Sequence, residues 1–173
     1  VLGVFGSSAA GAVNNITFSN GANAFALGAI SNIHNLTVTN SGNITTSSNN
    51  TFTGALSLTS SGTINLSNTE TAVGVTLSGT TDTLGATLTS TGAVSITSSQ
   101  ATSGTGIALN SGISASGQTV TLTANGYDNG ANYAVIEGTS GAVTASTLTV
   151  NSNHATGGHP ALLISLNLLL LSV

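Results

Sequence analysis

The side chains of this chain that could carry acid–base or metal chemistry are few. The carboxylates are Glu70, Asp82, Asp128 and Glu137, and the imidazoles are His34, His154 and His159. Glycoside hydrolysis needs two carboxylates that face each other across the scissile bond. Glu70 and Asp82 share one of the repeats described below and Asp128 and Glu137 another, but no spacing forces either pair together. Glu70 and Asp128 adjoin turn signals, where an acid is a routine turn residue. We expect no catalytic residues and no enzyme.

The histidines offer one candidate metal site. His154 and His159 flank a Gly-rich loop, so two imidazoles could meet there. A third ligand would have to come from far away in the sequence, and the chain has no Cys. We therefore expect turn histidines facing solvent, with no metal and no cofactor. The repeated Gly-Gly-x-Gly-x-Asp pattern of calcium-binding rolls is also missing.

Composition excludes several classes of partner. The chain has 173 residues, of which 29 are Thr, 25 Ser, 22 Gly and 19 Asn, and it has no Lys or Arg. Without cations it cannot neutralise phosphates, so nucleic acids and anionic membrane surfaces are excluded as partners. With 39% apolar and 2% charged residues, it should fold.

Short strands separated by turns are indicated throughout. Apolar residues alternate with small polar residues, which is the pattern of a half-buried strand. Ser-Gly, Thr-Gly, Asn-Gly and Gly-Gly pairs between them indicate turns. Clear alternating segments are 36–38, 55–58, 64–66, 73–77, 94–96, 120–122 and 148–150. Gly, Thr, Ser, Asn and Val are poor helix formers and appear throughout the chain, so we expect an all-β protein.

Internal repetition narrows the architecture. Segment 58–66 (LTSSGTINL) resembles 88–96 (LTSTGAVSI) at an offset of 30 residues, and 38–44 (VTNSGNI) precedes the first copy by 20. A second series places a Gly-rich or polar turn before an apolar strand, beginning at Gly21, Glu70, Ser103, Gly130 and Gly157. Its last three strands begin near 107, 134 and 161. Each repeat is too small to bury its own apolar face, so it must stack on its neighbours.

These observations favour a parallel β-helix, or solenoid, of about six coils in a single domain spanning 1–173. We divide it into an apolar N-terminal segment (1–13), repeats (14–152), and a last coil with an apolar C-terminal strand (153–173). The structural alternative is an antiparallel β-sandwich, as in a pilin-like subunit.

Two segments resemble known families. Residues 12–58 are similar to the β-strand repeats of autotransporter passenger domains. Residues 85–152 resemble repeats of filamentous haemagglutinin-type adhesins secreted by the two-partner route. Both families are bacterial exoproteins built as right-handed β-helices. The resemblance implies that handedness, an extracellular or cell-surface location, and a structural or adhesive role as part of a stalk or filament. Host or neighbour-cell surface glycans are the partners that this role implies.

Thr-x-Thr triplets suggest a different function. Flat Thr arrays on β-helices are the surface used by ice-binding proteins, and such an array needs one pair at the same place in every coil. Such pairs include Thr37/Thr39, Thr81/Thr83, Thr87/Thr89, Thr119/Thr121, Thr121/Thr123 and Thr147/Thr149. They are irregularly spaced, and surface β-propensity also explains them. Ice binding and, less strongly, a carbohydrate-active β-helix enzyme remain the alternatives.

The C-terminus is a candidate for self-association. Segment 161–173 is apolar but too short to cross a bilayer as a helix, so we expect no membrane insertion. An uncharged apolar strand at a sheet edge pairs readily with another chain. We expect a homopolymer or pairing with the next coil of a longer chain; equally, this is a last core strand whose cap lies elsewhere. The residues concerned are Leu162, Leu163, Ile164, Leu166, Leu168, Leu169, Leu170 and Leu171.

Five Asn-x-Ser/Thr sequons are compatible with an extracellular protein. At this Asn and Thr content, chance matches are expected. The acceptor residues would be Asn15, Asn35, Asn43, Asn49 and Asn65.

Overall fold

Strands are the only regular elements in the described part of the protein. The computed structural model describes residues 5–6, 13–99, 104–126, 134–138, 141–154 and 163–164. Nineteen strands and no helix occur in these ranges, and every strand pair in them is parallel. The prediction of an all-β protein with parallel strands is confirmed. The antiparallel sandwich is wrong for the described residues. Each strand pairs with the equivalent strand of an adjacent repeat, and not with the strand that follows it in the sequence.

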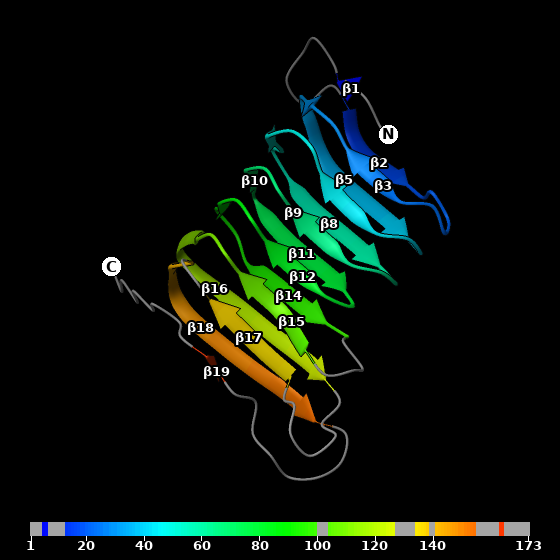
Figure 1. Ribbon diagram of the computed structural model, residues 1–173. Coiled ribbons are helices and arrows are strands. Elements are labelled where there is room, and N and C mark those ends of the chain that lie inside the picture. Colours follow the sequence, from blue (N-terminus) through cyan, green and yellow to red (C-terminus); the bar gives the residue numbers. More distant parts are fainter. Residues whose placement is uncertain are drawn as a thin grey trace.

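Three ladders of paired strands make up most of the structure (Figure 1). The first ladder contains, in pairing order, β2 (Val13–Phe18), β5 (Ile33–Asn40), β8 (Ala55–Ser60), β11 (Gly74–Gly79), β14 (Val94–Ser98), β16 (Ile113–Gly126) and β18 (Val143–His154). The second ladder contains β3 (Phe25–Leu27), β6 (Ile44–Thr46), β9 (Ile64–Leu66), β12 (Asp82–Leu84), β15 (Gly104–Leu109), β17 (Ala134–Gly138) and β19 (Leu163–Ile164).

The third ladder is shorter and joins the first. It contains β7 (Asn50–Thr51), β10 (Glu70–Ala72), β13 (Leu88–Ser90) and the beginnings of β16 and β18. A separate parallel pair links β1 (Phe5–Gly6) with β4 (Ile30–Ser31). The ladders alternate along the chain in a fixed order, so that β8, β9 and β10 are followed by β11, β12 and β13. In Figure 1 the colours therefore run in sequence from the blue strands at one end to the orange strand at the other.

The bend in β16 carries the chain from the third ladder to the first. Ile113 pairs with Leu88 of β13, whereas Val120 pairs with Val94 of β14. Between them, Gly117 has a φ of 73°, a left-handed conformation that glycine adopts without a Cβ penalty. Glycine at this position lets one continuous strand serve two ladders.

One apolar core lies between the ladders. Inward residues of successive strands stack in register, as in the column Val38, Leu58, Leu77, Ile96 and Leu122. All five side chains are buried. Complete burial of one aliphatic side chain contributes roughly 1.5–3 kcal/mol, and here the covering surface comes from the layers on either side.

The register tests the predicted repeats. Val38 pairs with Leu58, and Ile44 lies opposite Ile64, which confirms the offset of 20. Ile107 pairs with Ile136, and Ile136 with Leu163, so the last three predicted strands are also neighbours.

The offset of 30 is wrong as a pairing register. Leu58 lies in β8 of the first ladder and Leu88 in β13 of the third. The two similar segments, 58–66 and 88–96, form the same strand–turn–strand motif at two different corners. The segment beginning at Glu70 was predicted to be equivalent to those beginning at Gly21, Ser103, Gly130 and Gly157. This prediction is wrong, because the segment forms β10 and β11 and not a strand of the second ladder.

Candidate functional site

Glu70 lies in the interior, at the start of β10, so the interpretation of it as a turn residue is wrong. Its side chain has no exposed surface. It stands in register between Asn50 of β7 and Leu88 of β13. The Nδ2 group of Asn50 donates a hydrogen bond of 3.2 Å to Oε1, while Oε2 finds no partner among the described residues. Asn50 also accepts a 2.7 Å bond from the backbone N–H of Ile30, so it bridges two layers.

Asp82 interrupts a column of isoleucines. It begins β12 and pairs with Ile64 on one side and Ile107 on the other. The side chain is completely buried, and neither carboxylate oxygen has a side-chain partner among the described residues. A charged carboxylate in these surroundings would lack both water and a counter-ion.

Burial determines the protonation of both acids. Desolvation raises the pKa of Glu70 to about 8, although hydrogen bonds with Asn50 and Thr46 oppose the shift. Desolvation likewise raises the pKa of Asp82 to about 7, opposed by a backbone hydrogen bond with Gly79. At neutral pH both acids are therefore substantially protonated, Glu70 more than Asp82.

The acids are not arranged as a catalytic pair. By strand pairing, Glu70 belongs to the third ladder and Asp82 to the second. The two carboxyl groups therefore come from different ladders, separated along the chain by β11. Glu137 lies on β17 opposite Ala108, and Asp128 lies outside the described residues.

The histidines are well separated in the described part of the chain. His34 is half-buried on β5, and its Nδ1 lies 3.0 Å from Oγ1 of Thr53. His154 ends β18 opposite Gly126, and His159 lies outside the described residues. No group of three potential ligands that could hold a metal ion occurs among the residues searched, which are those that the structure describes.

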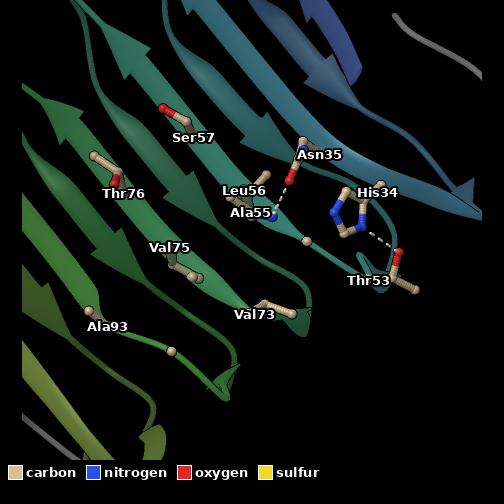
Figure 2. Close-up of a pocket in the computed structure, with 13 residues that line it drawn as sticks. His34, Asn35, Thr53, Ala55, Leu56, Ser57, Val73, Val75, Thr76 and Ala93 are labelled. Carbon is tan, nitrogen blue, oxygen red and sulfur yellow. Dashed lines mark hydrogen bonds between the residues drawn. The ribbon is translucent and has the colours of Figure 1, made fainter. Parts of the chain in front are cut away.

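A shallow groove of about 520 Å³ crosses the start of β8 and β11 (Figure 2). Its floor has small residues in successive layers, Ala55, Gly74 and Ala93, and the Val73 side chain beside it is 45% exposed. His34 lies at one end with its hydrogen bond to Thr53. The groove is not apparent from the sequence, because its small residues belong to separate repeats and become neighbours only through the strand register.

Next to the groove lies an ordered polar surface, which we call the hydroxyl face. It consists of outward positions of the first ladder that form two parallel columns. The inner column is Thr17, Thr37, Ser57, Thr76, Ser95, Thr121 and Thr149. The outer column, two residues further along each strand, is Thr39, Thr59, Ser78, Thr97, Thr123 and Asn151.

The hydroxyl face explains the irregular spacing of the Thr-x-Thr pairs in the sequence. Within 51–80, Ser57 with Thr59 and Thr76 with Ser78 occupy the same register as Thr37 with Thr39. The irregular spacing arose from counting triplets of different ladders together, since Thr83 lies in β12 and Thr89 in β13. Accepting serine and following one ladder gives a hydroxyl pair in every layer from β5 to β16.

The sequon asparagines stabilise the corners. The Oδ1 atoms of Asn35, Asn43 and Asn49 each accept the backbone N–H of the residue twenty positions later, at 2.7, 3.0 and 2.9 Å. Asn35 also donates to Oδ1 of Asn15 at 2.8 Å, so both ends of its amide group are occupied. Asn15, Asn43 and Asn49 are exposed, and Asn35 and Asn65 are half-buried. Glycosylation at the five sequons remains a prediction.

The C-terminal candidates are only partly described. Leu163 and Ile164 form β19, which pairs with Ile136 and Glu137 and is the last strand of the second ladder. Leu162, Leu166 and residues 168–171 lie outside the described residues. The structure thus places the described part of this segment at the end of a sheet.

No helix suited to crossing a bilayer is found within the described ranges. Comparison of the chain with family models, curated proteins and solved structures finds no match.

Proposed function

We propose that this chain is a segment or subunit of an extracellular structural protein, a stalk or filament with adhesive surfaces. In this proposal the three ladders are the faces of a right-handed parallel β-helix of about six to seven coils. At an ordinary strand separation of about 4.8 Å, seven stacked strands give a rod roughly 30 Å long. A longer protein with more copies would form a proportionally longer rod.

The observation that carries the proposal is the unbroken parallel register of the first ladder from β2 to β18. Every layer buries its aliphatic side chains against the layers next to it, as Leu77 does between Leu58 and Ile96. Backbone hydrogen bonds run along the stack, so bending the rod would break many of them at once. Stiffness along the stack is the property that a stalk requires.

Chemistry at the surface supports adhesion to neutral partners. The chain has no Lys or Arg, and the two acids with described side chains are buried. Outward positions present hydroxyls, amides and small apolar groups instead, and these suit hydrogen bonding to uncharged glycans of host or neighbouring cells. Nucleic acids and anionic membranes do not fit such a surface.

Self-association through the C-terminal segment is part of the proposal. An edge strand exposes unpaired N–H and C=O groups, and β19 occupies the edge of the second ladder. Neighbouring subunits would pair there through residues 161–173, with β3 as the opposite edge of the same ladder. Analytical ultracentrifugation of the full chain and of a chain lacking 161–173 tests this, with polymers expected from the first and monomers from the second. Polymers of unchanged length after the deletion contradict it.

Surface exposure is tested on cells that produce the protein from its natural gene. An antibody against 13–99 should bind intact cells, and brief protease treatment of those cells should remove the signal. Protection of the chain until the cells are lysed would overturn the extracellular role. A cytoplasmic marker that stays intact under the same treatment shows that the cells did not leak.

A further inference from the structure

The hydroxyl face has a two-dimensional order that a stalk does not require. Its rows follow the strands of the first ladder, where parallel neighbours are about 4.8 Å apart. Within a strand, residues two positions apart are separated by about 6.6 Å. Thr37 and Thr39 in β5, Ser57 and Thr59 in β8, and the later pairs therefore mark the points of a nearly regular lattice.

Buried side chains on the inner side of the strands hold the hydroxyl groups in place. Between the two hydroxyls of each row lies one inward side chain, such as Leu58 between Ser57 and Thr59, or Leu77 between Thr76 and Ser78. These inward side chains are completely buried. Threonine, the commonest residue of the face, has few χ1 rotamers, so its hydroxyl and methyl groups keep their places without a large ordering cost.

The ligand class follows from the order of the face and from its lack of charge. The columns contain Thr, Ser and a single Asn, so no charge and no aromatic ring stands on the face. A single sugar would use one or two rows and gains nothing from repetition over six strands. A ligand that repeats in two dimensions at the spacing of these hydroxyl groups would bind more tightly to a longer array, because each row adds a further contact. The surface of an ice crystal is such a ligand: its oxygens form a regular lattice of hydrogen-bond donors and acceptors.

We propose that the hydroxyl face binds ice. The Thr methyl groups and the small residues of the adjoining groove limit competing hydration, while the hydroxyls hold water molecules in positions that continue the crystal. Binding requires the first ladder alone. It therefore does not depend on surface attachment or on residues 161–173, and it can fail while the stalk proposal stands.

The experiment is ice-affinity partitioning of the full chain together with thermal hysteresis measured on single crystals. The wild-type chain should be incorporated into slowly growing ice and should lower the freezing point below the melting point. Thr76→Tyr places a bulky ring in the middle of the face, where Thr76 is exposed, and should reduce incorporation about tenfold. A folded wild-type chain that stays in the liquid fraction overturns the proposal.

A matched control uses the second ladder, which carries none of the hydroxyl face. Thr83 is the outward residue of β12 in the second ladder, and Thr83→Tyr should leave incorporation unchanged. Equal losses in both variants would contradict a face-specific mechanism. Thr59→Tyr, in the other column, provides a second variant if circular dichroism shows that Thr76→Tyr does not fold. Binding to insoluble cellulose that responds to Thr76→Tyr, without any effect on ice, would assign the face to a polysaccharide and overturn the ice proposal.

Discussion

The carboxyl group of Asp82 occupies the space that the missing side chain of Gly79 leaves in the core. A Cβ atom on Gly79 would lie 2.7 Å from Oδ1 of Asp82. Gly79 is in register with Ser98, and Asn40 and Ser60 precede it in the same buried polar column. Asp82 therefore places a polar group in this column from the neighbouring strand, where Gly79 contributes none.

Stability should fall as the pH rises. The folded-state pKa values of about 7 for Asp82 and 8 for Glu70 lie above the ordinary values of 3.8 and 4.5. The folded state thus binds protons that the unfolded state has released. The stabilisation is complete below pH 4 and is lost as the pH rises through 7 and 8. Each group contributes a slope of about 1.4 kcal/mol per pH unit between its two pKa values. Thermal unfolding from pH 4 to pH 9 measures this, and a flat profile would contradict the burial of the two acids.

Glu70→Gln should make the profile shallower. Glutamine keeps the length of the side chain and an oxygen that accepts the hydrogen bond from Asn50, but it cannot ionise. At pH 9 the variant should be more stable than the wild-type chain by up to about 5 kcal/mol, because glutamine carries no charge that must be buried between pH 4.5 and pH 8. Urea unfolding at pH 5 and pH 9 provides the comparison. Equal stability losses at both values would show that Glu70 acts through packing and not through its charge.

Gly92→Ala and Gly74→Ala should differ sharply, although both residues line the same groove. A Cβ on Gly92 would collide with the backbone carbonyl oxygen of Val73, whereas one on Gly74 has the carbonyl of Ala93 at 3.7 Å as its nearest neighbour. We expect a loss of about 1–3 kcal/mol for Gly92→Ala and little change for Gly74→Ala. The free energy of unfolding of each variant decides this. Similar values for both would show that the two layers are not packed as closely as described.

Leu77→Ala and Thr76→Ala test the inward and outward faces of one strand. Leu77 is completely buried between Leu58 and Ile96, so its truncation should cost about 2–5 kcal/mol. Thr76 points outward, and its truncation should change the free energy of unfolding by about 0.5 kcal/mol or less. Chemical denaturation measures both, and a reversed order would refute the assigned register.

Sequence patterns predicted the parallel ladders but not the interior positions of the acids. Alternation identifies which residues of a strand point inward only after copies are aligned correctly. The aligned triplets are Ile44-Thr-Thr, Ile64-Asn-Leu, Asp82-Thr-Leu and Ile107-Ala-Leu. In that alignment Asp82 stands at an inward position. An alignment at an offset of 30 residues does not reveal this position, because it aligns the β8–β9 turn with the β13–β14 turn, which joins different ladders.

The hydroxyl face was missed for a related reason. A Thr-x-Thr pattern read along the chain mixes three ladders whose surfaces point in different directions. Ser57 and Ser78 also substitute for threonine without breaking the column, so a search restricted to threonine finds gaps in it. Only the strand register shows that Thr37, Ser57 and Thr76 are neighbours. These residues are about 20 positions apart in the sequence, and they meet only because the chain folds back on itself.

Layer-by-layer burial also bears on how such a protein can change over evolutionary time. Leu58 meets Val38 and Leu77 through equivalent positions, so an inserted copy of 20 codons would present the same surfaces to both neighbours. Duplication or loss of a unit by unequal recombination would then alter the reach of the molecule without requiring a new interface. The number of copies in the gene, and not the redesign of any contact, would then set the length of the stack.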